Sequence, residues 1–367
     1  MRVFIVHKDI YDAGNPYIYT LKESIEKNHP NVLFSWGEDI FWSDKLFEYD
    51  IIHFHWPAAF LDCDEHHHTL DDFNIQIRKA KAHGVKIVST CHDLCPHYTQ
   101  GASFADAITF VYENSDAIFH LGEYSKNLFV EQYPNSVHMF LPHHIYDEIY
   151  KSRPDKKIAR EKLGLDETKK YVLCMGAFRA KEERNLILYL TKKLRCKGVE
   201  FIAPAFDRVG TSLKKSFPFV TRGLHKYIYY RYIRGIHLTG KKWVPISDEE
   251  MPYYYAACDL AFVQRLKILN SGNAVMPLLF GCPVMGPNTG NVGPFLQEYG
   301  GYLFDVDNLS HLPQEICKIL FESQSNEACI TDEKVMSQLS THVIAEKQYQ
   351  FYKYIMDRAY EEHIIRK

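Results

Sequence analysis

One stretch of the chain combines small, polar and glycine residues in an order suited to binding an anion. Residues 270–290 read NSGNAVMPLLFGCPVMGPNTG: a polar loop, a short apolar helix, a Gly-Cys-Pro turn, a buried strand and a second glycine loop. In a doubly wound α/β domain such loops lie beside each other at strand carboxyl ends, where nucleotides and phosphates bind. Ser271, Gly272 and Asn273 would present backbone N–H groups at a helix N-terminus. We expect the diphosphate of a nucleotide sugar here; an ordinary capped helix start is the alternative.

Two cations follow another predicted strand and offer the positive charge that a diphosphate needs. The strand YVLCMGAF leads into Arg179 and Lys181. Cations are unfavourable at a helix N-terminus unless an anion is near, and the planar fork of Arg suits phosphate. The pair therefore predicts diphosphate binding, while a solvated basic helix start is the alternative. Because these cations could neutralise the diphosphate, no metal ion or other cofactor is expected.

Acid–base chemistry would fall to His92 and Asp93, which directly follow the apolar strand GVKIVST. A strand that ends in a polar pair can deliver a catalytic side chain to the edge of its sheet. If the reaction inverts a sugar, Asp93 would be the base that deprotonates an acceptor hydroxyl. Asp93 could instead cap a helix, which is a common role for Asp, and the two roles are compatible.

Candidate contacts to a sugar or an acceptor lie near the ends of two other predicted strands. His55 and Trp56 end the segment YDIIHFHWP, and the Trp56 ring could stack on a sugar face. His53 shares this strand and is interpreted as a core histidine. Asn15 follows the first strand and can cap the next helix, with Pro16 in the first helical turn.

Composition indicates a soluble globular protein of ordinary character. The chain has 367 residues, 46% hydrophobic and 24% charged, and a formal net charge of −3. This length suits two domains, and the charge gives no electrostatic reason to expect nucleic acid. The N-terminus reads as a strand and not as a signal peptide, and no apolar run approaches the ~20 residues that span a bilayer. The sequence therefore predicts a cytoplasmic protein.

The nine cysteines are scattered, which fits reduced core thiols better than a disulfide framework. Two tracts resemble metal sites, one around Cys91 and Cys95 and the other from Cys63 to His68. Neither has a second set of ligands elsewhere in the chain, so neither predicts a metal site.

Strand and helix signals alternate along the chain and predict the elements that position these residues. Apolar strands separated by helical segments imply parallel sheets with both faces covered. The predicted fold is α/β, with two doubly wound Rossmann-like domains facing across a cleft. The domains are expected at 1–148 and 171–345, with a charged connection at 149–170 and a C-terminal helix at 346–367 that could return to the first domain. No G-x-G-x-x-G motif follows the first strand, which argues against a dinucleotide-binding dehydrogenase.

Several motifs together resemble GT-B-fold glycosyltransferases, especially family 4-like bacterial enzymes of surface-polysaccharide assembly. They are GNPY, HFHWP, TCHDL and LPHH in the first domain and GAFRAK, SGN and GCPV in the second. The resemblance implies acceptor binding in the first domain, with Asn15, His55 and Trp56 as contacts, and donor binding in the second. For a retaining enzyme it implies that the leaving phosphate is the base, while His92 and Asp93 position the sugar and the acceptor.

One departure from the family concerns ribose recognition. Many retaining members carry two glutamates separated by seven residues, and the corresponding positions here are Ile268 and Met276. Neither side chain can accept a hydrogen bond from a ribose hydroxyl, so other groups must recognise the nucleoside. Retention cannot be inferred from the fold.

Residues 214–242 are rich in Lys, Arg and Tyr. Such a segment can lie on a membrane surface, although a helix or insertion packed on the second domain is the favoured interpretation. A lipid-linked acceptor would bring the protein to the inner face of the membrane.

The function expected from the sequence is transfer of a hexose from a nucleotide sugar to a hydroxyl of a glycan or lipid-linked glycan in cell-surface polysaccharide synthesis. A nucleotide-sugar epimerase and a catalytically degenerate glycan-binding or scaffold protein are the alternatives.

Overall fold

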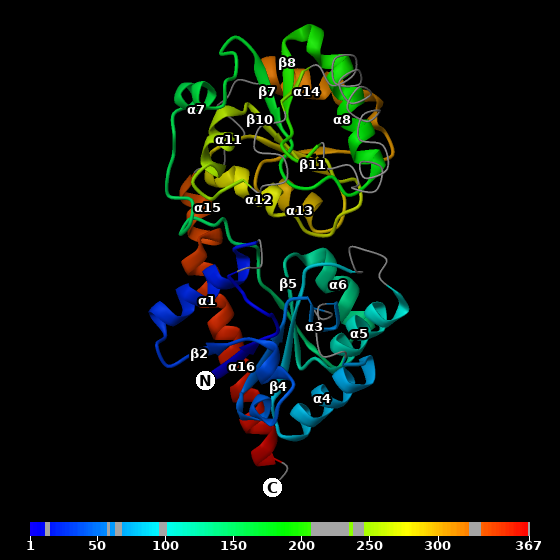
Figure 1. Ribbon diagram of the computed structural model, residues 1–367, viewed down its shortest axis with the longest axis vertical. Helices are drawn as coiled ribbons and strands as arrows, with labels where there is room; N and C mark the ends of the chain where they lie inside the picture. Colours follow the sequence, from blue (N-terminus) through cyan, green and yellow to red (C-terminus); the bar gives the residue numbers. More distant parts are fainter. Residues whose placement is uncertain are drawn as a thin grey trace, which may run out of the picture. The chain divides into compact units, whose positions relative to one another are not determined.

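The computed structural model describes residues 1–11, 15–56, 59–62, 68–94, 101–206, 235–237, 246–322 and 332–365. It divides into two compact units. Unit 1 comprises Met1–Glu148 and Met336–Lys367, and unit 2 comprises Ile149–Val335. Each unit contains a six-stranded parallel sheet flanked by helices (Figure 1). The predicted pair of doubly wound α/β folds is confirmed.

The sheet of unit 1 has the strand order β2-β1-β3-β4-β5-β6. The strands in this order are β2 (Leu33–Ser35), β1 (Arg2–Ile5), β3 (Ile51–Phe54), β4 (Lys86–Cys91), β5 (Ala117–His120) and β6 (Val137–Phe140). Its helices are α1 (Tyr17–Asn28), α2 (Glu38–Phe41), η1 (Asp44–Glu48), α3 (Ala59–Asp62), α4 (Leu70–Ala82), α5 (Gly101–Asn114), α6 (Glu123–Gln132) and α16 (Thr341–Ile365). All residues of β3 and β5 are buried, because helices cover both faces of a doubly wound parallel sheet.

The C-terminal helix α16 belongs to unit 1. It packs along α1, and its Tyr352 is fully buried. Asp147 accepts hydrogen bonds from the backbone N–H and the hydroxyl of Thr341, at 2.7 and 2.8 Å, at the point where α16 begins. The C-terminal helix therefore returns to the first domain, as the sequence suggested, but it begins at Thr341 and not at residue 346.

The sheet of unit 2 has the strand order β12-β11-β10-β7-β8-β9. The strands in this order are β12 (Tyr302–Phe304), β11 (Val284–Pro287), β10 (Leu260–Phe262), β7 (Lys170–Leu173), β8 (Val199–Ile202) and β9 (Ile236–His237). Its helices are α7 (Lys156–Lys162), α8 (Lys181–Leu194), η2 (Arg195–Lys197), α11 (Met251–Ala257), α12 (Gly272–Leu279), α13 (Val292–Glu298), η3 (Leu309–His311) and α14 (Leu312–Phe321), and α15 (Asp332–Leu339) spans the boundary to unit 1. The edge strands β2 and β12 have only three residues each.

Helix α7 lies in the segment 149–170, for which the sequence suggested a charged connection between the domains. Asp155 caps this helix through a bond from the backbone N–H of Lys157, at 2.8 Å. The buried Arg160 donates to Asp259, at 2.7 Å, and to the backbone oxygen of Ala257, at 3.1 Å. A buried ion pair with further hydrogen bonds is costly to break, so this segment is anchored to unit 2.

None of the described helices combines the length and the apolar character that a bilayer crossing requires. The basic, Tyr-rich segment 214–242 lies outside the described residues, apart from 235–237.

Candidate functional site: the carboxyl edges of the two sheets

The loop after β7 is joined to the start of α12 by a close backbone approach. Gly176 has a φ of +84°, and a Cβ atom there would lie 2.7 Å from Nδ2 of Asn273. That nitrogen donates to the backbone oxygen of Met175 at 2.8 Å, and Nε2 of Gln264 donates to the same oxygen at 3.1 Å. The side chain of Asn273, a predicted anion contact, therefore also ties two loops together.

The two glycine loops around α12 lie side by side, as the sequence predicted. Asn291 donates its backbone N–H to Leu269, at 2.9 Å, and its side-chain N–H to Oδ1 of Asn270, at 2.7 Å. Gly290 has a φ of +55°, and a Cβ there would lie 2.5 Å from the backbone oxygen of Ile268. Only glycine fits such a site without strain.

Ser271 precedes α12 and its side chain makes no capping hydrogen bond. Gly272 is the first helical residue. The first backbone N–H groups of a helix have no partner within that helix, so this helix start can present donors and positive potential to an anion. The predicted residues Ser271, Gly272 and Asn273 are thus together at one helix N-terminus.

Arg179 and Lys181 lie at the start of α8, and both side chains are exposed. The buried carboxylate of Glu183 accepts the backbone N–H of Arg179 at 2.7 Å. Glu183 is thereby engaged with the backbone, and within the described part of the chain neither the guanidinium of Arg179 nor the ammonium of Lys181 has a hydrogen bond or ion pair. Two unpaired cations at a helix N-terminus are electrostatically unfavourable without an anion.

A different cluster occupies the carboxyl edge of the unit 1 sheet. Nδ1 of His55, after β3, lies 3.0 Å from Nε2 of His92, after β4, in a hydrogen bond between the two rings. The ring of Trp56 stacks on His92 with centroids 4.9 Å apart, and Tyr17 meets His92 edge-on at 5.1 Å. The structure therefore brings three predicted site residues together, and it adds Tyr17, to which the sequence gave no role. His55 and Trp56 hold the ring of His92 in place.

The imidazoles of His53, His55, His143 and His144 are buried, and burial favours their uncharged form. Burial lowers the pKa of His53 to about 3 and that of His143 to about 4, and it lowers the pKa of His55 and His144 well below the usual range. Neighbouring histidines lower the pKa of His53, His55 and His144 further, since two imidazolium ions would repel each other. Both ring nitrogens of His53 are bonded, Nδ1 to the Tyr352 hydroxyl at 2.6 Å and Nε2 to the Thr90 hydroxyl at 2.8 Å. His53 is a core histidine, in agreement with its interpretation from the sequence.

Asp93 follows His92 and is half-buried. Its backbone oxygen lies 3.9 Å from the sulfur of Cys91, which donates a weak hydrogen bond. Burial raises the pKa of the Cys91 thiol to about 12, and the charge of Asp93 adds to the effect. The residues that follow, 95–100, lie outside the described part of the chain, so the capping alternative for Asp93 stays a prediction.

Asn15 is bound from two sides. Its side-chain oxygen accepts the backbone N–H of Tyr17 at 3.0 Å and the hydroxyl of Tyr146 at 3.1 Å. Helix α1 begins at Tyr17, so Pro16 precedes the helix, and the prediction that Pro16 occupies the first turn is wrong. The side chain of Asn15 still satisfies the first amide of the helix, which is the purpose of a cap.

Among the described residues there is no group of three or more His, Cys, Asp or Glu side chains that could hold a metal ion. The six described cysteines are free. His68 stacks on Trp42 at 3.9 Å, and the rest of the tract from Cys63, like Cys95, falls outside the described ranges.

No protein-family model matches the chain, and a search of curated protein sequences gave no match either. Solved structures do match over nearly the whole chain, and they show that it has the GT-B fold. Sucrose-phosphate synthase from Thermosynechococcus elongatus is 14% identical with a TM-score of 0.68, and the match covers 98% of this chain and 100% of that one. HepE of Anabaena in complex with UDP-glucose is 16% identical with a TM-score of 0.68, covering 96% and 100%. A Listeria monocytogenes protein assigned as a UDP-N-acetylglucosamine 2-epimerase is 12% identical with a TM-score of 0.60, covering 95% and 94%.

Proposed function

We propose that the protein is a glycosyltransferase that moves a hexose from a nucleotide-diphosphate sugar to a hydroxyl of a glycan or lipid-linked glycan, in cell-surface polysaccharide synthesis. The observation that supports this most directly is the pair of exposed cations, Arg179 and Lys181, which have no hydrogen bond or ion pair among the described residues and lie beside a glycine-built loop in a chain with the GT-B fold. The solved HepE structure with this fold contains UDP-glucose, which supports a nucleotide sugar as donor.

In this proposal the second unit binds the donor diphosphate. Arg179, Lys181 and the N–H groups of Ser271, Gly272 and Asn273 stabilise the negative charge that grows on the diphosphate as the glycosidic bond breaks. These groups make a metal ion unnecessary. Ile268 and Met276 cannot bind ribose through carboxylates, so backbone groups of the same loops contact the nucleoside.

The first unit supplies the acceptor side. His92 is fixed by His55 and Trp56, and its ring positions the sugar or the acceptor. Asp93 takes the proton of the acceptor hydroxyl if configuration inverts. If configuration is retained, the leaving phosphate takes that proton, and His92, Asp93 and Asn15 position the reactants. The protein works in the cytoplasm, and a lipid-linked acceptor brings it to the inner face of the membrane.

The donor site is tested by thermal shift with UDP-, GDP-, CMP- and dTDP-sugars. A ligand at one hundred times its dissociation constant adds ~2.7 kcal/mol of stability. The stabilisation should be largely lost in Arg179→Ala. Arg195→Ala is the matched control, because Arg195 is also exposed but follows the opposite end of α8. If no nucleotide sugar stabilises the protein, the proposal fails.

Turnover is tested by incubating the stabilising donor with the protein and identifying the products. Release of free sugar and nucleotide diphosphate that is lost in Asp93→Asn, with donor binding retained, supports transfer chemistry. An epimerised nucleotide sugar would instead establish the epimerase alternative, which one structure of the same fold favours. Binding without any product would establish the scaffold alternative.

A further inference from the structure

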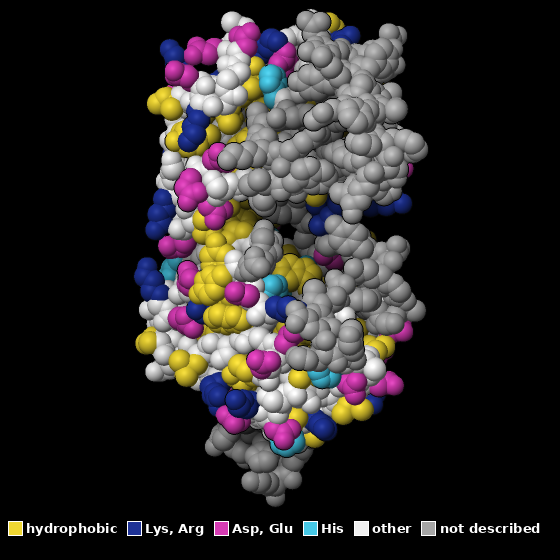
Figure 2. Space-filling view, viewed as in Figure 1, with side chains coloured by type: hydrophobic (Ala, Val, Ile, Leu, Met, Phe, Trp, Pro, Cys, Tyr) yellow, Lys and Arg dark blue, Asp and Glu magenta, His cyan; other side chains and the backbone are white. Residues whose placement is uncertain are grey.

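A group of partly exposed aromatic rings lies beside the first turns of α1. Tyr11, which follows β1, lies 5.3 Å from the ring of Tyr19 and 5.8 Å from that of Trp36, which follows β2. Tyr11 is 50% exposed, and Tyr19 and Trp36 are half-buried. These three residues are called the aromatic platform. In the space-filling view, hydrophobic side chains gather over α1 with acidic and basic side chains beside them (Figure 2).

The platform is held in place by polar bonds along α1. The Tyr11 hydroxyl donates to Oε1 of Glu23 and accepts from Nζ of Lys22, both at 3.1 Å. The Lys22 ammonium also lies over the rings of Tyr11 and Trp36, at 5.6 and 5.5 Å from their centroids. An exposed ring fixed in this way offers its face to a ligand with little loss of conformational entropy.

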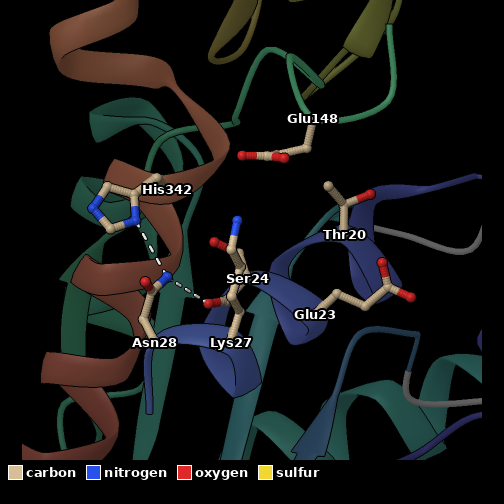
Figure 3. A pocket seen from close by; sticks show the side chains of 7 residues that line it. All are labelled: Thr20, Glu23, Ser24, Lys27, Asn28, Glu148 and His342. Atoms are coloured by element: carbon tan, nitrogen blue, oxygen red, sulfur yellow. Dashed lines mark hydrogen bonds between the residues drawn. The ribbon is translucent and has the colours of Figure 1, made fainter. Parts of the chain in front are cut away.

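A polar pocket of about 200 Å³ adjoins the platform, because Glu23 lines the pocket and accepts the hydrogen bond from the Tyr11 hydroxyl. Side chains from α1, from the segment before Ile149 and from α16 converge on the pocket (Figure 3). The hydroxyl residues Thr20 and Ser24 are buried, while Lys27 and Glu148 are exposed. His342 contacts Asn28 across the pocket, with 3.3 Å between Nδ1 and Nδ2.

The combination of an aromatic platform and a polar pocket points to one class of ligand. Sugars present an apolar C–H face that stacks on aromatic rings and a rim of hydroxyls that both donate and accept hydrogen bonds. The pocket offers hydroxyl, amide, carboxylate and ammonium groups. It is smaller than the roughly 300–1,000 Å³ of pockets for drug-sized ligands, so it suits one sugar ring and not a nucleotide sugar. We propose that this surface binds a glycan, with one sugar on the platform and a neighbouring sugar in the pocket.

The charges of this surface disfavour an anionic lipid membrane. Asp9, Glu23, Glu26 and Glu148 contribute carboxylates, against the ammonium groups of Lys22 and Lys27. Binding to anionic lipid depends on clusters of Lys and Arg. An excess of carboxylates repels such a surface, whereas it can accept hydrogen bonds from neutral sugar hydroxyls.

The position of the platform connects it to the candidate acceptor site. Tyr11 and Trp36 follow β1 and β2, and His55 and His92 follow β3 and β4. All of these strands are parallel neighbours, so the residues that follow them share one edge of the sheet. Identifying the bound glycan as the acceptor rests on the proposed function, but the binding itself does not.

The test is binding of the full chain to an immobilised array of linear and branched oligosaccharides, neutral and acidic, followed by calorimetric titration of the strongest binder. The double variant Tyr11→Ala/Trp36→Ala should lose about tenfold or more in affinity, in line with loss of stacking on two rings. Lys27→Gln should weaken binding by a smaller factor. Tyr124→Ala is the matched control, because Tyr124 on α6 is 48% exposed and lies outside this surface; its affinity should stay unchanged.

Three results would overturn the inference: no oligosaccharide is bound, the double variant binds as tightly as the natural chain, or the surface binds anionic vesicles or a protein ligand and no sugar. Unchanged stabilisation by a nucleotide sugar in the double variant shows that it is folded and that the two sites are separate. If nucleotide sugars never bind but glycan binding depends on the platform, the proposed transferase fails while this inference stands.

Discussion

The carboxyl edges of the two sheets differ in their chemistry. In unit 1 the edge is made of packed rings, with His55 and His92 against Tyr17 and Trp56 stacked on His92, and burial lowers the pKa of His55 well below its usual value. In unit 2 the edge is made of glycine turns and amides, with exposed cations at a helix start. The packed rings of unit 1 can orient a hydrogen bond, whereas the backbone N–H groups and cations of unit 2 provide positive charge.

Because the two edges differ in this way, different changes should disrupt them. The unit 1 edge depends on keeping imidazoles neutral in a buried place, so it is sensitive to acid. The unit 2 edge depends on backbones that approach closely, so it is sensitive to the addition of a single methyl group.

The largest expected effect is acid destabilisation of unit 1. The pKa values of His53 and His120 are lowered to about 3 and that of His143 to about 4, mainly by burial. In the unfolded chain these three histidines take up a proton once the pH falls below their ordinary pKa of 6.5. In the folded chain they stay unprotonated until the pH is much lower. Stability is therefore fully present above that pH and is lost as the pH falls toward the folded values, by ~2 kcal/mol for each histidine between pH 7 and 5.

Urea unfolding followed by tryptophan fluorescence measures this loss, because Trp36, Trp42 and Trp56 are in unit 1. Unit 2 provides the contrast. Its Glu200 has a pKa lowered by bonds to Lys169 and His237 against the effect of burial, so the contribution of that group is lost only below its ordinary value of 4.5. A midpoint that does not change between pH 7 and 5 would show that the histidines are solvated in solution.

A methyl group added to the unit 2 edge should have the next largest effect. Gly176→Ala combines a backbone φ of +84° with a Cβ at 2.7 Å from Nδ2 of Asn273. Gly84→Ala is the matched control, because Gly84 has a φ of +87° and nothing within 4 Å of the added atom. The control should lose ~1–2 kcal/mol of stability from the left-handed backbone, and Gly176→Ala should lose a further ~1–3 kcal/mol from overpacking.

Thermal unfolding and nucleotide-sugar titration measure the two losses for Gly176→Ala. The double variant Gly176→Ala/Asn273→Ala should recover part of the steric term, since it removes the clashing amide. Equal losses in Gly176→Ala and Gly84→Ala would mean that the contact with Asn273 has no energetic weight.

A smaller effect is expected from breaking the ring-to-ring bond of unit 1. In His55→Leu, Nε2 of His92 loses its partner, at a cost of ~1 kcal/mol because the half-buried ring can reach water. Imidazole nitrogen NMR signals of His92 should shift in this variant. In Trp56→Phe, which retains an aromatic face, they should remain nearly unchanged. Unaltered His92 signals in His55→Leu would contradict the hydrogen bond.

Sequence patterns could predict which strands end at the two edges, but not how the side chains meet there. His92 and Asp93 were predicted from the strand before them, and Arg179 and Lys181 in the same way. The role of Tyr17 was not predicted, because its contacts to His55, His92 and His143 come from three separate strand ends. Gln264 and Tyr352 were missed for the same reason: their partners are 89 and 299 residues away.

Turn positions were the easiest to predict. Gly290 and Gly176 lie in loops rich in turn residues, whereas the close contacts with Ile268 and Asn273 that leave no room for a side chain come from other loops. Asn273 shows the limit of such reasoning. Its place at a helix start was predictable from the loop before it, whereas its bond to Met175, 98 residues away, requires the assembled sheet.

The smallest expected effect concerns the charges of two lysines at opposite ends of α8, one that would bind a ligand and one that stabilises the helix. Lys181 is the first residue of α8, where positive charge opposes the helix dipole, and Lys192 lies in the last turn, where it is favourable. At low salt and without nucleotide, Lys181→Gln should raise the unfolding free energy by ~0.3–1 kcal/mol, and Lys192→Gln should lower it by a similar ~0.3–1 kcal/mol. Chemical denaturation at low and high salt measures both changes, which should shrink as salt screens the exposed charges.

With a saturating nucleotide sugar the change in unfolding free energy for Lys181→Gln should reverse its sign, because the natural chain then gains an anion beside its ammonium. If the gain persists with the ligand bound, Lys181 does not contact the diphosphate, and the positive charge of the unit 2 edge rests on Arg179 and the helix N-terminus.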